Sequence, residues 1–243
     1  MNLQLDGLHA IVTGGSSGIG AAVVRALAAE GCRVSFCARG QEQIDKTLLA
    51  LADLPGKVEA TSKDVTEREN FAKWIEALGP FDIFIPNVSA ISTDWKCSLR
   101  TDVEATVDAT EAAIPVLLKS SHGAITYIGS KAGSLAAPHS ASYGASKAAM
   151  AHYMKSLASR LLPSVRVNTV SPGDTLFEGG LWDQERKNNP ENFKTVVQRN
   201  PLGRLATPEE IARVVAFISS PSASFVAGAN WYVDGNSTNH VQF

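Results

Sequence analysis

The sequence predicts an α/β fold, a single domain built on a doubly wound parallel sheet of six to seven strands with helices on both faces. Short apolar runs rich in β-branched residues alternate with longer helical segments, as buried parallel strands and their crossover helices do. A glycine-rich turn follows the first run and opens the first helix. No linker, repeat or low-complexity tract divides the chain, so one domain is expected over residues 1–243.

The elements follow one another in a regular order. Six apolar runs are expected to be strands: Ala10–Val12, Val34–Cys37, Val58–Thr61, Ile83–Ile85, Ile125–Ile128 and Val165–Val170. Helices are expected at Ala21–Glu30, Gln41–Ala52, Arg68–Leu78, Asp102–Lys119, Ser142–Leu161 and Pro208–Ile218. Pro115 lacks a backbone N–H and predicts a kink or break in the fourth of these helices. Ligands of such sheets bind outside the carboxyl ends of the strands, so residues that follow a strand are candidate site residues.

Composition and charge exclude several classes of protein. Lys and Arg total 22 against 24 for Asp and Glu, so no basic field points to nucleic acid or an acidic membrane, and a small molecule is the expected partner. The chain has no signal-peptide pattern at Met1–Asp6 and no run of eighteen apolar residues, which predicts a soluble, cytoplasmic protein. The cysteines, Cys32, Cys37 and Cys97, lack metal-ligand spacing, so reduced thiols and no metal are expected.

The first expected strand ends in a glycine-rich loop, Thr13–Gly20, that reads TGGSSGIG. Strand, glycine loop and helix in this order form the context of a Rossmann-type dinucleotide site, because glycines allow the backbone to approach a pyrophosphate at the helix N-terminus. The expected cofactor contacts are Gly14, Ser16, Ser17, Gly18, Ile19 and Gly20. The spacing differs from the standard G-x-G-x-x-G, and a turn without a ligand is the alternative.

The second half of the chain contains three residues that suit acid–base chemistry. Tyr143 and Lys147 are separated by one helical turn, and Ser130 lies thirteen residues upstream of the tyrosine. A free tyrosine has a pKa of about 10, and an ammonium at i+4 favours the phenolate and lowers this pKa. With a serine hydroxyl to bond the substrate oxygen, the set can move a proton on a carbonyl or alcohol. The alternative is an ordinary tyrosine and lysine on a helix.

Together these motifs resemble the short-chain dehydrogenase/reductases, whose signature joins TGxxxGIG to a Ser and Tyr-x-x-x-Lys set. The resemblance extends to Asp64–Val65, Asn87, Asn168–Gly173 and Val233–Gly235, and 3-oxoacyl-carrier-protein reductases are among the similar members. It implies hydride transfer between a nicotinamide and a carbonyl or secondary alcohol. Tyr143 is then the proton donor in reduction, Ser130 polarises the carbonyl, and Lys147 also bonds the nicotinamide ribose. Further implied cofactor contacts are Asp64, Val65, Asn87, Ser89, Tyr143, Lys147, Pro172, Gly173 and Thr175.

The choice of cofactor depends on the residues after the second expected strand. No carboxylate is present there to bond a ribose 2′-hydroxyl, and Arg39 offers a planar cation suited to a 2′-phosphate. NADP(H) is therefore predicted over NAD(H). The alternative is a solvated Arg39 with NAD as the cofactor, since Ser16 and Ser17 stand where many NADP-preferring relatives carry a basic residue. For Asp64, the alternative to a cofactor contact is a helix-capping role.

Two residues depart from the family pattern. Counting back from Pro115, Asp102 stands where relatives carry the asparagine of the catalytic tetrad, and its charge is expected to oppose formation of the tyrosinate. A surface carboxylate is the alternative for Asp102. Ser89 replaces a glycine and is expected to narrow the cofactor pocket slightly.

The sequence predicts the substrate-binding residues less precisely than the cofactor-binding residues. By resemblance, residues 174–200 form a mobile lid, with Phe177, Trp182, Leu181 and Trp95 as candidate apolar walls; the tryptophans could instead cover the core or an oligomer interface. A 3-oxoacyl thioester or another ketone is the expected substrate. An NAD-dependent secondary-alcohol dehydrogenase and a non-catalytic NADP-binding regulator remain alternatives. Relatives suggest a homotetramer joined through the 102–119 and 142–161 helices, whose small residues include Ala145, Ala148, Ala149 and Ala151.

Overall fold

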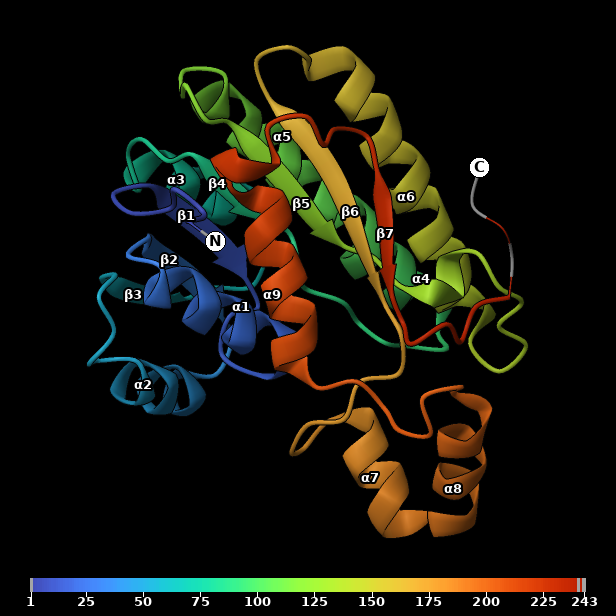
Figure 1. Ribbon diagram of the computed structural model, residues 1–243. Coiled ribbons are helices and arrows are strands. Elements are labelled where there is room, and N and C mark those ends of the chain that lie inside the picture. The colour runs from blue at the N-terminus through green and yellow to red at the C-terminus, as the bar shows by residue number, and fades with distance from the viewer. Residues whose placement is uncertain (1, 240, 242–243) are drawn as a thin grey trace.

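The computed structural model describes residues 2–239 and 241, which fold around one parallel sheet (Figure 1). In this part of the chain the sheet has seven strands in the order β3-β2-β1-β4-β5-β6-β7. They are β1 (His9–Thr13), β2 (Arg33–Ala38), β3 (Val58–Ser62), β4 (Ile83–Ile85), β5 (Ala124–Ile128), β6 (Arg166–Pro172) and β7 (Asn230–Val233). The order reverses between β1 and β4, which is the switch point where ligands of doubly wound sheets bind. The predicted fold class is confirmed.

Helices cover both faces of the sheet, and each face has its own apolar core (Figure 1). On one face lie α1 (Gly18–Ala29), α2 (Gln41–Ala50) and α9 (Pro208–Ser219); on the other lie α3 (Arg68–Ala77), α5 (Ala105–Leu117) and α6 (Ala141–Leu161). Because strand side chains alternate in direction, Thr126 of β5 faces α9, whereas its neighbour Tyr127 is buried in the core beneath α6. Both faces are therefore closed, and the carboxyl edge of the sheet remains for a site.

The segment before α5 differs from the expected single helix at Asp102–Lys119. A short helix, α4 (Trp95–Ser98), runs into a π-helical turn at Leu99–Glu104, and α5 follows directly. The break predicted at Pro115 is wrong, because α5 continues through this residue to Leu117. A proline so near the end of a helix removes one backbone bond from the last turn, which the helix tolerates. The irregular turn lies earlier and contains Asp102.

Two helices, α7 (Leu181–Asn188) and α8 (Pro190–Arg199), stand beyond the carboxyl ends of the strands (Figure 1). They belong to the segment for which the sequence predicted a lid. The buried carboxylate of Asp183 accepts a hydrogen bond from the Gly179 N–H and forms ion pairs with Arg186 and Lys187. Short 3₁₀ turns occur at Lys131–Gly133 and Pro221–Ala223. Within the described residues, no helix combines the length and apolar character needed to cross a bilayer.

Candidate active site

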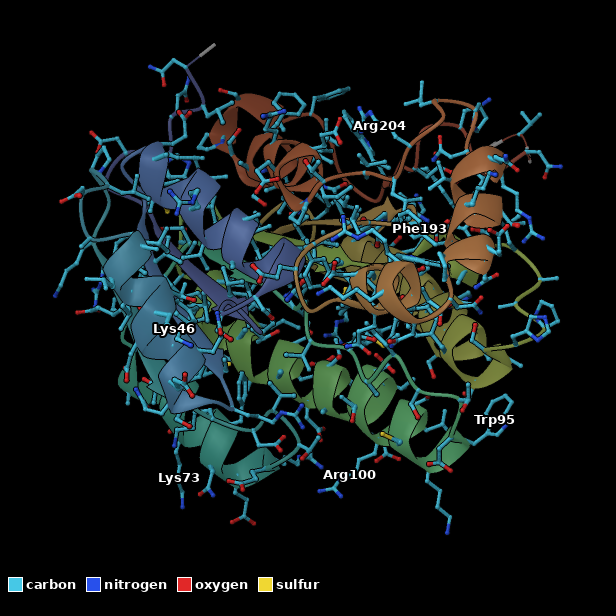
Figure 2. All side chains as sticks on the ribbon, turned by 90° about the horizontal axis from the view of Figure 1, so that it is seen from below. Lys46, Lys73, Trp95, Arg100, Phe193 and Arg204 are labelled. Atoms are coloured by element: carbon cyan, nitrogen blue, oxygen red, sulfur yellow. The ribbon has the colours of Figure 1, made fainter. Side chains whose placement is uncertain are left out.

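A cleft of about 1500 Å³ opens at the carboxyl edge of the sheet, the edge onto which Figure 2 looks. It runs from the glycine loop, past the ends of β4 and β5, to the lid segment. Its lining contains every predicted site residue except Asp102 and Trp95: Gly14, Ser16, Ser17, Gly18, Ile19, Gly20, Arg39, Asp64, Val65, Asn87, Ser89, Ser130, Tyr143, Lys147, Pro172, Gly173, Thr175, Phe177, Leu181 and Trp182. The structure thus brings together residues that are far apart in the sequence.

The glycine loop is held in a shape that only glycine permits. Gly14 and Gly18 have φ angles of +70° and +51°, which residues with a Cβ rarely adopt. A Cβ on Gly20 would lie 2.1 Å from the Gly14 carbonyl oxygen. The Asn87 side-chain amide donates to the Thr13 and Gly14 carbonyl oxygens at 2.9 and 3.2 Å, which ties the loop to the end of β4.

Helix α1 begins directly under this loop. Its N-cap residue, Ser17, makes no side-chain capping bond, so the first N–H groups of the helix face the cleft without a partner from that side chain. Helix N-termini of this kind bind phosphate through N–H groups and the helix dipole. The cradle fits the pyrophosphate of a dinucleotide.

Cationic side chains line the far end of the cleft. Strands β2 and β3 pair Ala38 with Ser62, so the next residues, Arg39 and Lys63, both follow paired strand ends and both line the cleft. The sequence did not identify Lys63, because its position beside Arg39 depends on the register of two strands. A 2′-phosphate at this end would meet two cations.

Asp64 closes a turn instead of capping a helix. Its Oδ1 accepts hydrogen bonds of 2.8 Å from both the N–H and the hydroxyl of Thr66, whereas the N-cap of α3 is Glu67. Burial raises the pKa of Asp64, but the Thr66 bonds and the charges of Arg39 and Arg100 outweigh it and leave the pKa below its usual value. The helix-capping alternative is therefore wrong.

Ser130, Tyr143 and Lys147 converge on the middle of the cleft. Ser130 follows β5 and accepts a hydrogen bond from the Ala132 N–H at 3.1 Å, which fixes the start of the 3₁₀ turn. Tyr143 lies in the first turn of α6, and the nearby Ser130 hydroxyl lowers the Tyr143 pKa. The Lys147 Nζ lies 5.7 Å from the centre of the Tyr143 ring. This is the arrangement required for a proton donor beside a polarising hydroxyl.

The pKa of Tyr143 differs from the expectation. Burial raises it above its ordinary value, the Ser130 hydrogen bond lowers it, and the charges of Asp102 and Asp174 raise it. Lys147 was predicted to lower this pKa, but burial of Lys147 lowers its own pKa to about 8, against an opposing effect of Asp102. Lys147 loses its charge at a lower pH than the one at which Tyr143 ionises, so no ammonium remains to favour the phenolate. In the free protein, Tyr143 therefore holds its proton at neutral pH.

Asp102 lies behind the cleft and is completely buried, so the alternative of a surface carboxylate is wrong. The π-helical turn points its Oδ1 at the Ala90 N–H, 3.1 Å away, while Oδ2 has no hydrogen-bond partner. The Lys147 ammonium is bonded elsewhere, to the Tyr127 hydroxyl and the Ile128 carbonyl oxygen. Asp102 acts on the lysine and on Tyr143 through its charge alone.

Not all of the candidate substrate residues line the cleft. The ring of Phe177 packs on the glycine loop, because a Cβ on Gly18 would lie 2.7 Å from its Cζ. Trp182 lines the cleft, whereas Trp95 is 52% exposed at the start of α4 and points away from it (Figure 2). Thr175 is buried, and its hydroxyl donates to the Gly173 carbonyl oxygen at 3.0 Å. Phe177 thus covers the cofactor half of the cleft, and Trp95 is not one of its walls.

An ion pair that the sequence did not predict stands next to Ser130. Lys131 and Asp174 are joined at 2.6 Å, and the lysine also donates to the Ser237 hydroxyl at 3.2 Å. The pair links the segment after β5 to the beginning of the lid and to the carboxyl-terminal segment. It depends on residues far apart in sequence, so no local pattern could have identified it.

The three thiols lie in different environments. Cys32 and Cys37 are fully buried, and burial raises the pKa of each to about 12. Cys97 is exposed and lines the rim of the cleft. In the described part of the chain, no group of three or more His, Cys, Asp or Glu residues is placed to hold a metal ion.

A doubly wound sheet, a dinucleotide cradle and a Ser, Tyr and Lys set define an oxidoreductase. Comparison with known proteins agrees: a family model described as enoyl-(acyl carrier protein) reductase matches residues 14–238. This chain belongs to the short-chain dehydrogenase/reductase family.

The relatives and solved structures cover almost the whole chain. Isoepoxydon dehydrogenase of Penicillium expansum is 36% identical over 98% of this chain and 98% of its own. A 3-oxoacyl-[acyl-carrier-protein] reductase of Thermotoga maritima is 29% identical over 96% and 98%. L-Sorbose reductase of Gluconobacter frateurii, solved with NADPH and L-sorbose, has 25% identity, a TM-score of 0.92 and coverage of 99% and 100%. A 7α-hydroxysteroid dehydrogenase solved with NADH has 26% identity, a TM-score of 0.88 and coverage of 97% and 96%.

Proposed function

We propose that this protein is an NADP(H)-dependent oxidoreductase that transfers a hydride between the nicotinamide and a carbonyl carbon, with reduction as the favoured direction. The observation that carries the proposal is the convergence of Ser130, Tyr143 and Lys147 in a cleft that continues into the dinucleotide cradle. NADP(H), when bound, supplies the hydride. The open N–H groups of the glycine loop and the cations Arg39 and Lys63 would hold its phosphates.

The chain's own residues provide the proton chemistry. Ser130 holds the substrate oxygen, and Tyr143 gives this oxygen a proton as the carbonyl becomes an alcohol. Burial keeps the Tyr143 pKa high, so the phenol is protonated at neutral pH, as a donor in the reductive direction must be. Lys147 would bond the nicotinamide ribose, and Asp102 raises the pKa values of both Lys147 and Tyr143 through its charge.

We propose a compact, polar ketone as the substrate class. The L-sorbose bound by one structural neighbour supports this, and so does the mixed character of the lining beyond Ser130. That part of the lining includes the polar residues Ser92, Thr93, Lys96, His139, Ser140, Glu185 and Asn192. Segment 174–200 would close over substrate and nicotinamide as a lid, with Phe177 already resting on the glycine loop.

The test is an assay of NADPH consumption by purified protein against ketoses, hydroxylated cyclic ketones and β-ketoacyl thioesters. Turnover fastest with the first two groups is expected. Faster turnover of β-ketoacyl thioesters would show that the substrate is an acyl thioester and not a compact ketone. Faster oxidation of secondary alcohols with NAD would favour the dehydrogenase alternative, and NADPH binding without any turnover would favour the regulator.

Arg39→Ala should weaken binding of NADPH at least about tenfold more than binding of NADH, because a charge-assisted bond to the 2′-phosphate contributes about 1.5–3 kcal/mol. Fluorescence titration of both cofactors measures the difference. Arg33→Ala is the matched control, since Arg33 lies at the opposite end of β2 and pairs with Glu59. Equal losses for the two cofactors would show that Arg39 does not read the phosphate.

Asp102→Asn should shift the pH profile of the oxidative reaction toward lower pH. Oxidation needs the deprotonated tyrosine, so its rate rises as the pH passes through the pKa of the coupled site. The Asp102 charge raises the Tyr143 pKa, and its removal lowers the pH at which activity appears. Asp108→Asn is the control, since Asp108 lies on α5 and pairs with Arg68 of α3. An unshifted profile would mean that Asp102 has no electrostatic effect on the site.

We also propose a cytoplasmic homotetramer joined through α5, α6 and the carboxyl-terminal segment. The support is that Ala145, Ala148 and Ala149 are exposed on α6 in the single chain, so this small-residue face is free to approach another helix.

A further inference from the structure

Lys147 is held by strand β5 and not by the nearby carboxylate. Its Nζ donates to the Tyr127 hydroxyl and to the Ile128 carbonyl oxygen, each at 3.0 Å. The ammonium also lies 4.9 Å from the centre of the Tyr127 ring, within the range of a cation–π contact. Lys147 and Tyr127 are both almost fully buried, at 2% and 1% exposure. Two neutral oxygens and an aromatic face therefore surround a cation that has left water.

Burial of the Tyr127 hydroxyl costs free energy of desolvation that a phenylalanine would avoid. Its side chain lies in the apolar core between β5 and α6, among residues such as Met150 and Met154, where phenylalanine would fill almost the same volume. A buried hydroxyl needs a hydrogen-bond partner to offset its desolvation, and here the partner is the Lys147 ammonium. The hydroxyl thus connects the core of the sheet to the proton chemistry in the cleft.

We propose that Tyr127 is a positioning residue that fixes the place and the protonation state of Lys147. The proposal rests on the role of Lys147 given under the proposed function. Loss of the Tyr127 hydroxyl leaves the ammonium with the Ile128 carbonyl alone, which disfavours the charged form and releases the side chain.

Few other titratable groups act on Lys147. Asp102, in the π-helical turn, raises its pKa through charge, and Tyr143 is the ionisable neighbour on its own helix. Burial outweighs Asp102 and leaves the pKa of Lys147 at about 8. Removal of the Tyr127 hydroxyl takes away a group that stabilises the ammonium, so the pKa of Lys147 should fall further.

The experiment compares Tyr127→Phe with Thr126→Val. Thr126 is the neighbouring residue on β5, and its hydroxyl accepts a buried hydrogen bond of 2.8 Å from Ser219 on the opposite face of the sheet. Both changes remove one buried hydroxyl while nearly conserving volume, so both should lower the melting temperature. Only the phenylalanine variant should alter Lys147.

Two readouts separate positioning from stability. Tyr127→Phe should lower kcat at least about tenfold, the effect of one bond to a charged group, with a smaller change in the substrate KM. The ¹⁵N NMR titration of the Lys147 Nζ, assigned with Lys147→Met, should shift to lower pH by half a unit or more. Thr126→Val should keep the kcat and the titration of the parent protein.

A Lys147 titration in Tyr127→Phe that matches the parent would overturn the proposal, as would a kcat no lower than that of Thr126→Val. The NMR arm uses no substrate or cofactor. If the parent protein reduces no ketone, the proposed function fails while the titration still decides the role of Tyr127.

Discussion

Tyr143→Phe should lower turnover by about a hundredfold to ten-thousandfold, the range that general acid catalysis contributes, while NADPH affinity stays within a few fold. The phenyl ring keeps its packing in the first turn of α6, so only the hydroxyl group and its proton are lost. Single-turnover kinetics with NADPH and a reactive ketone, together with cofactor titration, measure both quantities.

Tyr153→Phe provides the matched control for this variant. Tyr153 lies on the same helix, and its hydroxyl donates to Glu111 at 2.8 Å, far from the cleft lining. It should keep nearly all activity. If Tyr143→Phe retains more than about a tenth of the parent turnover, which is a barrier change of under about 1.4 kcal/mol, another group supplies the proton.

Gly20→Ala should abolish tight NADPH binding. The new Cβ would lie 2.1 Å from the Gly14 carbonyl oxygen and 2.6 Å from the Asn87 side-chain nitrogen, so the glycine loop must move out of the shape that fits a pyrophosphate. Overpacking of this kind costs about 1–3 kcal/mol. We expect a lower melting temperature and a loss of NADPH affinity of at least about tenfold, which corresponds to 1.4 kcal/mol.

Gly56→Ala separates cofactor binding from general destabilisation. A Cβ on Gly56 would lie 2.0 Å from the Cys32 carbonyl oxygen, an equally close backbone contact, but Gly56 does not line the cleft. This variant should lose stability and keep its NADPH affinity. Equal affinities for the two alanine variants would mean that the glycine loop is not the phosphate cradle.

The sequence predicted β1 to β6 because each is a short run rich in apolar and β-branched residues between helices. It did not list β7, whose residues Asn230–Val233 form a short, partly exposed edge strand. The π-helical turn at Leu99–Glu104 was not predicted either, because one extra residue in a single turn hardly changes the spacing of the apolar residues. Helices α7 and α8 are mostly polar and solvent-facing, so the pattern showed only a polar stretch.

The predicted site residues that line the cleft have one property in common: they follow strands, or lie on the helices that begin beside strand ends. The parts that were missed depend on distant contacts, as the bond from Lys147 to Tyr127 does. Spacing along a helix predicted that Tyr143 and Lys147 would be neighbours, which they are. It could not predict how much water each loses, and that loss decides the direction of both pKa shifts.

The three thiols differ in a way that is useful for spectroscopy. Thiol-directed dyes react with the thiolate, and the buried Cys32 and Cys37, with pKa values of about 12, have almost none of it at neutral pH. Cys97 stands exposed on α4 at the rim of the cleft. A maleimide fluorophore would therefore attach to Cys97 of the folded chain without removal of any native cysteine, and its emission would report the binding of a molecule in the adjoining cleft.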